Sequence, residues 1–262
     1  MINPDVLRLT CFVVILLLCA VWETRAPRKA LTQNRWFRWT NNLGLVGLNG
    51  LTMALLSPIA AVEAALFASR SGFGLFNWYE LPLPLVVIGS VVLLDLTIYL
   101  QHLVFHRVPI LWRLHRMHHS DQDIDVTTGA RFHPVEIWLS IWVKVAVVVL
   151  LGAPVIAVVA FEIILNGSAM FNHSNAKLPL SMDKVLRKLI VTPDMHRVHH
   201  SVIVRETHSN FGFFLSIWDR IFSTYRAQPE KGHHEVEIGI DKFRLPDEQR
   251  LDKMLTQPFR QK

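Results

Sequence analysis

The stretch LPLPLVVIGSVVLLDLTIYLQHLVFHR, residues 81–107, combines an apolar run with a pair of histidines. Its apolar part, Leu81–Phe105, contains Asp95 as its only formal charge. At about 1.5 Å per residue this helix is longer than the roughly 30 Å hydrocarbon core of a bilayer. His102 and His106 are four residues apart and therefore share one helix face. The sequence predicts a membrane-spanning helix that presents two histidines at one membrane boundary.

Two further apolar runs precede this helix. Val6–Trp22 is interrupted only by Arg8 and is just long enough to cross a bilayer. A cleaved signal peptide would begin with basic residues, whereas here the basic cluster follows the run, so we expect an uncleaved anchor. Leu43–Ala68 contains Glu63 as its only charge and predicts a second spanning helix.

A fourth apolar region, Ile137–Phe171, is broken at Gly152-Ala153-Pro154, where a helix should stop. A first leg of residues 137–151 would extend only about 22 Å, less than the hydrocarbon core. We therefore expect a helical hairpin that enters the membrane and returns, with full spanning left open. Lys144 in this hairpin can extend its ammonium group to the interface.

The composition agrees with a membrane protein. Of 262 residues, 51% are hydrophobic and 18% are charged, whereas soluble domains carry about 25% charged residues. A composition this rich in hydrophobic residues excludes disordered, collagen-like and secreted disulfide-rich proteins. Cys11 and Cys19 both lie in the first apolar run, so no disulfide framework or cysteine metal site is expected. The net charge of +6 comes from basic residues that flank apolar runs, so we expect no nucleic-acid partner.

Loop charges predict the orientation. Five basic residues lie between the first two runs, and Arg70 alone lies in the next loop; the five are Arg25, Arg28, Lys29, Arg35 and Arg38. The positive-inside rule therefore makes the first loop cytoplasmic. All histidine clusters then lie on the cytoplasmic side of a bacterial inner membrane or an endoplasmic-reticulum-type membrane.

Thirteen histidines occur in the chain, and most form short clusters. After His102 and His106 come HRMHH, FNHSN and HRVHH, which contain His115, His118, His119, His173, His196, His199 and His200. Residues three and four apart share a helix face, so we expect each cluster to aim its imidazoles at one point. A lone histidine pair is usually an ordinary polar feature, but two HxxHH clusters and an HxxxH at one boundary predict a metal centre. Imidazole binds iron, zinc, copper or nickel, and nine ligands are too many for one tetrahedral zinc. Two metal ions with open coordination positions fit this number.

These clusters resemble the fatty acid hydroxylase/sterol desaturase superfamily of membrane di-iron enzymes. The resemblance rests on HxxxH, HxxHH, a hydrophobic hairpin and a second HxxHH, in that order. It extends over about residues 85–226 and includes RFHPVE (131–136), FNHSNAKLP (171–179), TPDMHRVHHS (192–201) and NFGFFLSIWDRIFSTY (210–225).

The resemblance implies two iron ions, molecular oxygen as co-substrate, and oxidation of a lipid. The metal ligands it implies, which are also the catalytic residues, are His102, His106, His115, His118, His119, His173, His196, His199 and His200. Some relatives have a further histidine where this chain has Ala169, and Asn172, a backbone carbonyl or water would replace it. His133 is expected either to bind metal or to support a ligand, and His208 is a weaker candidate. We expect His233 and His234 to face solvent.

Metal-bound histidines usually donate their second N–H to a carboxylate or carbonyl. Asp95, seven residues before His102, and Asp194, two residues before His196, are our candidates for this role. Asp95 could equally form a hydrogen bond between helices.

The expected substrate is an apolar membrane lipid that enters laterally between the third run and the hairpin. Turnover needs two electrons, and the sequence has no dinucleotide-binding fingerprint and no room for a fused reductase or haem domain. A separate ferredoxin or cytochrome-type donor with its reductase is therefore expected. Basic residues near the clusters could steer an acidic donor, although membrane orientation explains them equally well; they are Arg107, Arg113, Arg116, Arg197 and Arg205.

The sequence thus predicts an all-α integral membrane bundle of three spanning helices and a helical hairpin, with a cytoplasmic helical, histidine-rich cap. We expect an N-terminal transmembrane region (1–80), a catalytic domain (81–226) and a cytoplasmic tail (227–262). The leading function is hydroxylation of a lipid C–H bond. A desaturase would use the same site, and a non-enzymatic relative stays possible. A membrane metal-binding or transport protein is the alternative from another class, although a transporter would place its polar ligands near the bilayer midplane.

Overall fold

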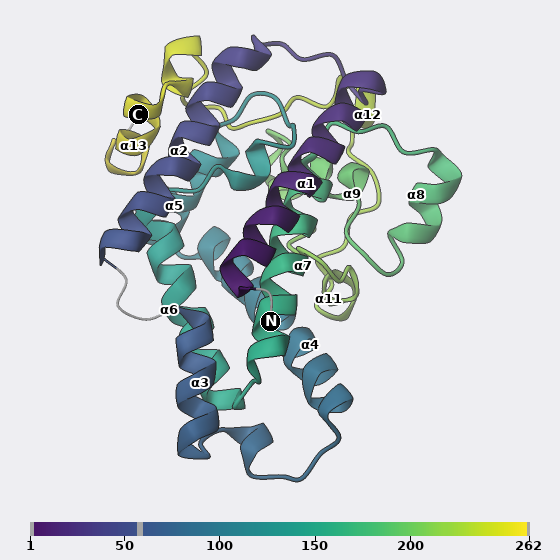
Figure 1. The fold of residues 1–262 in the computed structure, drawn as a ribbon. Coiled ribbons are helices and arrows are strands. Elements are labelled where there is room, and N and C mark those ends of the chain that lie inside the picture. The colour runs from purple at the N-terminus through teal and green to yellow at the C-terminus, as the bar shows by residue number, and fades with distance from the viewer. Residues whose placement is uncertain (1–2, 57–59, 261–262) are drawn as a thin grey trace.

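The computed structural model describes residues 3–56 and 60–260, and every regular element in these two ranges is a helix (Figure 1). The longer helices are α1 (Pro4–Arg25), α2 (Arg35–Leu56), α3 (Ala61–Ser71), α4 (Leu83–Arg107), α5 (Pro109–His119), α6 (Pro134–Leu151) and α7 (Val155–His173). The shorter ones are η1 (Leu75–Asn77), η2 (Thr128–Ala130), α8 (Leu180–Leu186), α9 (Pro193–His199), α10 (Val204–Thr207), α11 (Ile217–Ile221), α12 (Gly232–Glu235), η3 (Pro246–Gln249), α13 (Leu251–Thr256) and η4 (Gln257–Phe259).

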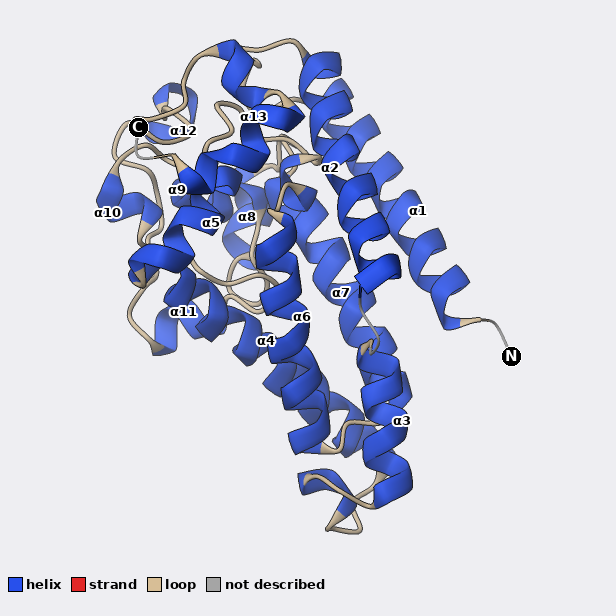
Figure 2. Ribbon diagram, turned by 90° about the vertical axis from the view of Figure 1, so that its left-hand side faces the viewer, coloured by secondary structure: helices blue, strands red, loops and turns tan. Residues whose placement is uncertain are grey.

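The histidine-bearing helices α5 and α9 lie at the opposite end of the molecule from α3 (Figure 2). In Figure 2, α5, α9, α10, α12 and α13 gather at the upper end, and α3 with the loop after it lies at the lower end. Four helices, α1, α4, α6 and α7, are long and apolar enough to cross a membrane. The chain is therefore a multi-pass membrane protein, and the predicted all-α membrane bundle is confirmed.

The second apolar run differs from the prediction. Instead of one helix over 43–68, the structure has α2 and α3, with residues 57–59 outside the described ranges. Neither helix is among the four candidate spans. Ala60, the residue before α3, is extended, with φ −97° and ψ 171°, so α3 begins as a new helix. In Figure 2, α2 lies toward the upper end of the molecule and α3 toward the lower end.

The predicted hairpin is present. α6 ends at Gly152, whose left-handed φ of 66° caps the helix, and α7 begins three residues later. Helix α6 starts at Pro134 rather than at residue 137, which lengthens it to about 27 Å and brings it close to the hydrocarbon thickness. Gly74 is required beside this turn, since a β-carbon on it would lie 2.2 Å from the Gly152 backbone nitrogen.

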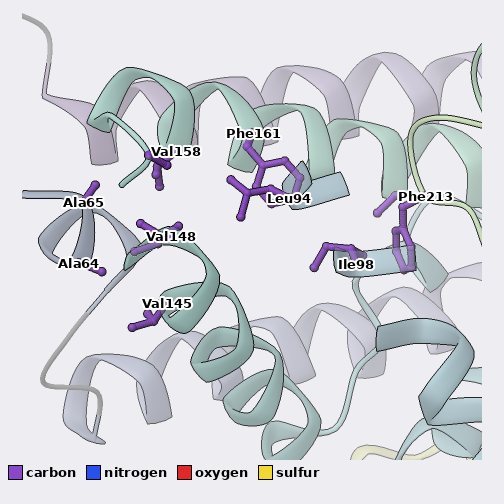
Figure 3. Close-up of a cluster of buried hydrophobic side chains, with 12 residues drawn as sticks. Ala64, Ala65, Leu94, Ile98, Val145, Val148, Val158, Phe161 and Phe213 are labelled. Carbon is purple, nitrogen blue, oxygen red and sulfur yellow. The ribbon is translucent and has the colours of Figure 1, made fainter. Parts of the chain in front are cut away.

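The main apolar core lies where α3, α4, α6 and α7 meet (Figure 3). Ala64 and Ala65 of α3 pack beside Val148 of α6, and Leu94 of α4 packs with Phe161 of α7. Small residues on α3 let it approach the hairpin closely. This core fixes α4 and α7, the two helices whose ends carry His102, His106 and His173.

The C-terminal segment is bound to the histidine-bearing helix α5. Arg113 donates to the Pro258 carbonyl at 2.7 Å, Arg116 to the Gln257 carbonyl at 2.6 Å, and Ser120 to Gln257 Oε1 at 2.8 Å. The short helix expected after Pro246 is present as η3 and α13. Residues 246–260 therefore support the histidine-rich end of the molecule.

Lys144 forms an ion pair between apolar helices. Its ammonium lies 2.5 Å from a carboxylate oxygen of Glu162 on α7, and Arg8 of α1 pairs with the same carboxylate. One carboxylate therefore links three apolar helices.

Candidate metal centre

Nine histidines lie together where four helices end. His102 and His106 are on the last turns of α4, His115, His118 and His119 on α5, His173 ends α7, and α9 carries the last cluster. They form a five-histidine group (His102, His106, His115, His119 and His199) and a four-histidine group (His118, His173, His196 and His200). Within each group, one nitrogen per ring lies within 4.8 Å of all the others, and every ring is buried. Each group can therefore hold a metal ion.

The two HxxHH clusters are divided between the groups in opposite ways. His115 and His119 belong to the five-histidine group, whereas His118 between them belongs to the four-histidine group. His196 and His200 belong to the four-histidine group, whereas His199 belongs to the other. The expectation that each cluster aims at one point is therefore wrong. Successive helical residues point about 100° apart, so adjacent histidines diverge and the i, i+4 pair stays together.

Hydrogen bonds on the outer side of the rings assign the protons of two members of the five-histidine group, His102 and His115. His102 Nδ1 lies 2.8 Å from the Phe211 carbonyl, and His115 Nδ1 lies 2.6 Å from Glu136 Oε1. An oxygen acceptor requires the proton on Nδ1, which leaves Nε2 of each neutral ring with a lone pair. These two Nε2 atoms face each other at 3.1 Å. Two lone pairs repel at this distance, so the geometry fits a cation between them.

The four-histidine group repeats this arrangement. His118 Nδ1 lies 3.2 Å from the Arg131 carbonyl, and His173 Nδ1 lies 2.7 Å from the Ala169 carbonyl. Their Nε2 atoms are 3.1 Å apart. His200 has no hydrogen-bond partner on either ring nitrogen among the described residues. The donor set again fits a metal ion.

Burial keeps the imidazoles on α5 and α9 neutral. It lowers the pKa of His115 to about 3. Burial, and then the neighbouring imidazoles, lower the pKa of His118, His119 and His200 well below the usual range. Neutral imidazole is the form that binds metal. The imidazoles of these two clusters are therefore in the form that binds metal at neutral pH.

Residues 209–219 orient two of the five rings through backbone atoms. The Ser209 carbonyl accepts from His199 Nδ1 at 2.7 Å, as the Phe211 carbonyl does from His102. Asp219 holds this segment, because its carboxylate accepts from the amides of Phe211 and Gly212 at 2.7 and 3.0 Å. Backbone carbonyls leave no side-chain signal, so sequence reasoning did not find them.

Glu136 is the carboxylate that supports a histidine, and sequence reasoning missed it. It lies in the first turn of α6, is 5% exposed, and pairs with His115. The available signal was RFHPVE, which was used only for the resemblance. A glutamate in an apolar helix near a histidine cluster was a reason to expect this role.

Asp95 does not contact a histidine, so its assignment as a partner of a ligand is corrected. Its Oδ2 accepts from the indole nitrogen of Trp218 at 2.8 Å and from the Leu215 amide at 3.1 Å. The alternative role in packing is the one present. Asp95 ties α4 to the end of the segment that orients His102 and His199.

Asp95→Ala should loosen this segment. Loss of a buried carboxylate that accepts two hydrogen bonds leaves the Trp218 and Leu215 donors unpaired, at a cost of about 1–3 kcal/mol each. We expect faster hydrogen exchange at the amides of residues 209–218, measured by mass spectrometry. Asp95→Asn is the control, since its amide oxygen keeps one acceptor and should give a smaller increase. Unchanged exchange in Asp95→Ala would show that Asp95 does not anchor the segment.

Asp194 also contacts no histidine of the two groups. Its carboxylate binds Arg28 at 3.0 Å and Arg197 at 2.5 Å, and His233 lies 3.8 Å away. Proximity in sequence to His196 was misleading, because Asp194 is held by arginines instead. His233 is consequently buried, which corrects the expectation that it faces solvent; His234 is exposed as expected.

His133 and His208 lie outside both groups. His133 Nδ1 accepts from the Val135 amide and caps α6, and its other nitrogen faces the Leu255 carbonyl at 3.3 Å. The expectation that His133 binds metal or supports a ligand is therefore not met. His208 is exposed, with its ring centre 5.5 Å from that of His106.

Ala169 stands where some relatives have a further histidine, and its backbone packs against Gly129 of η2. A β-carbon on Gly129 would lie 2.4 Å from the Ala169 carbonyl, so the two backbones are in close contact. Asn172 donates to the Phe213 carbonyl at 2.9 Å and belongs to neither group. The nine histidines form both groups without these positions.

An apolar cavity of about 230 Å³ borders the five-histidine group. It lies among α1, α2, α4, α6 and α7, with His102 and His115 in its wall. Phe132 and Phe213 contribute apolar surface to the same wall. A hydrocarbon substrate could therefore reach the histidines from the side of the apolar helices.

Comparisons with known proteins agree with this geometry. The profile of the fatty acid hydroxylase family matches residues 87–224. The chain is 28% identical over 185 residues to the ornithine lipid hydroxylase of Rhizobium tropici. The aligned region covers 70% of this chain and 53% of that protein. It is 30% identical over 151 residues to human alkylglycerol monooxygenase, and the aligned region is 57% of this chain and 32% of that protein. It is 23% identical over 153 residues to human cholesterol 25-hydroxylase, and the aligned region is 54% of this chain and 51% of that protein. No solved structure matches the chain.

The chain spans about half or less of the length of these relatives. The family match covers more than half of this chain and includes all nine histidines of the two groups. The chain belongs to the fatty acid hydroxylase family.

Proposed function

We propose that this protein hydroxylates a C–H bond of a membrane lipid, with molecular oxygen and two iron ions held by the two histidine groups. The observation that carries the proposal is the apolar cavity whose wall contains His102 and His115. The relatives act, by name, on an ornithine lipid, an alkylglycerol and cholesterol, which supports a lipid substrate.

The proposed reaction is balanced when an external donor supplies electrons. One oxygen atom enters the C–H bond as a hydroxyl group, and the other leaves as water with two electrons and two protons from the donor system. Bound iron would supply the activation of oxygen, which no side chain provides. Imidazole suits iron of this kind, because it binds through nitrogen and lacks the easily oxidised sulfur of cysteine.

The protein's own residues position the reactants. His102 and His115 are shared between the five-histidine group and the cavity wall, so the lipid would meet the centre there. The Phe211 carbonyl and Glu136 hold these two rings by their outer nitrogens. Phe132 and Phe213 exclude water on the cavity side.

We also propose that the histidine-rich end faces the cytoplasm and receives electrons there from a ferredoxin or cytochrome-type donor with its reductase. Arg116 and Arg197 cannot steer this donor directly, because both are buried in contacts within the chain. Arg107 and His208 are both exposed. The His208 ring centre lies 5.5 Å from that of His106, and Trp112 flanks both rings, with its ring centre 6.3 Å from that of His208 and 4.9 Å from that of His106. This is the side on which we expect the donor to bind.

Comparative lipidomics tests the function. Cells that express the intact chain and a compatible donor should contain a lipid with one added oxygen atom, which is absent from cells with His199→Ala at matched protein levels. Growth under labelled oxygen should transfer the label to that lipid. A product that instead lacks two hydrogen atoms would make the protein a desaturase. Unchanged lipids, with iron bound and the donor active, would contradict both activities.

A further inference from the structure

The cavity beside the five-histidine group is apolar, yet three hydrogen-bond acceptors in its wall have no partner among the described residues. They are Glu136 Oε2, Asn49 Oδ1 and Gln101 Oε1. Glu136 and Asn49 are 5% and 8% exposed. A buried acceptor without a donor is destabilising, so three around one cavity indicate that something else supplies the donors.

Two of these acceptors are held in place by bonds of the same side chain. Glu136 uses Oε1 to accept from His115 Nδ1 at 2.6 Å, which leaves Oε2 free. Asn49 donates from Nδ2 to the Phe132 carbonyl at 2.9 Å, which fixes the amide and identifies the free atom as its oxygen. Both residues therefore present oxygen atoms rather than N–H groups to a ligand.

A plain hydrocarbon chain cannot satisfy these atoms. A hydroxyl or an amine can, because both carry hydrogens to donate. The position of the acceptors also matters, since Glu136 bonds a histidine of the five-histidine group and Gln101 precedes His102 in α4. The donating group would therefore lie on the side of the cavity where His102 and His115 form its wall.

We propose that this cavity binds a lipid by a hydrogen-donating polar group, a hydroxyl or an amine, which Glu136, Asn49 and Gln101 accept. The oxidised carbon then lies close to this polar group and not at the far end of an alkyl chain. The position of oxidation rests on the proposed function, whereas the binding preference does not.

Binding of matched lipid probes tests the preference without turnover. The full-length protein in lipid nanodiscs, with and without iron, would be titrated with hexadecyl glycerol ether and with its dimethyl ether, which has no hydrogen to donate. An N-aminopropyl hexadecanamide and its trimethylammonium form make a second pair for the amine. We expect at least about tenfold tighter binding of the donating member in one pair, the loss typical of an unsatisfied buried acceptor. The pair that shows it identifies hydroxyl or amine as the group.

Variants locate the preference in the cavity. Asn49→Leu removes one acceptor at similar volume and contacts no histidine, so the preference should fall several-fold. Thr52→Val is the control, because Thr52 lies one turn further along α2 and does not line the cavity; its preference should equal that of the intact protein. Equal binding within both probe pairs by the intact protein, or an unchanged preference in Asn49→Leu, would overturn the proposal. The comparison within the intact protein decides the matter even if Asn49→Leu does not fold.

Discussion

His118→Ala combined with His200→Ala should remove one metal ion from the protein and leave the other bound with nearly unchanged affinity. Both histidines belong to the four-histidine group, which would keep only His173 and His196. Two imidazoles are too few to hold a metal ion against water, whereas the five-histidine group keeps all its nitrogens. Hydroxylation should fall to background, because the proposed reaction uses both ions.

The matched comparison is His199→Ala combined with His200→Ala. These histidines are adjacent in sequence but belong to different groups, so each group loses one ligand. Removing a residue that only hydrogen-bonds a metal ligand lowers metal affinity by about 10–100-fold. Because each variant histidine would itself be a ligand, we expect the metal affinity of both groups to fall by at least about 100-fold. Both double variants remove two buried histidines, which matches them for effects on folding.

Titration with iron against a competing chelator measures these affinities. The two double variants should differ in kind, with one strong site in the first and two weak sites in the second. If the two double variants lost iron affinity in the same way, each HxxHH cluster would not be divided between two metal sites.

Glu136→Ala should lower either the iron affinity of the five-histidine group or the turnover rate, by about 10–100-fold. The variant removes the acceptor of the His115 Nδ1 proton, which lies 2.6 Å from Glu136 Oε1. The His115 ring is then free to rotate and to change tautomer, and its Nε2 becomes a weaker ligand. Glu136→Gln keeps an oxygen acceptor and should lose less. Chelator competition and turnover per bound iron measure the two effects.

Glu162→Ala is the control for loss of a carboxylate from an apolar helix. Glu162 pairs with Lys144 and Arg8 and contacts no histidine. It should lower the thermal stability of the protein and leave its iron affinity unchanged. Equal loss of iron affinity in Glu136→Ala and Glu162→Ala would mean that general destabilisation, and not the bond to His115, is responsible.

The sequence was sufficient to predict the helical membrane fold and the residues that come together. Apolar length alone predicted α1, α4 and the α6–α7 hairpin, because lipid requires helices whose backbone bonds are satisfied internally. It failed for the second apolar run, where composition suggested one helix and the chain forms α2 and α3. Apolar length does not show where a helix is interrupted within an apolar run.

The division of the histidines could have been predicted from helix geometry. His118 and His119, like His199 and His200, are adjacent and point about 100° apart, so one metal ion cannot bind both in the same way. The spacing of three and four residues was emphasised instead. Which group each histidine joins depends on how α5 and α9 pack, and this is set by contacts distant in sequence.

The partners of the histidines were largely beyond sequence reasoning. Asp194 lies beside a cluster in sequence, but Arg28, more than a hundred residues away in the chain, binds it. Asp95 is on the correct helix but faces Trp218. The atoms that do support the rings include the carbonyls of Ser209 and Phe211, which any residue could supply. Only Glu136 left a usable signal, as a charge in an apolar helix.

Mössbauer spectroscopy of the intact protein, with iron counted per chain, shows how many iron ions the nine histidines hold and whether their environments differ. Our proposal is that the nine histidines hold two iron ions in unequal groups, one with five and one with four imidazoles. We expect two iron ions per folded chain and two distinct iron signals of equal intensity. A single iron ion per chain would contradict the division into two groups. So would iron that stays bound in a variant lacking all four histidines of the four-histidine group and at least two of the five-histidine group.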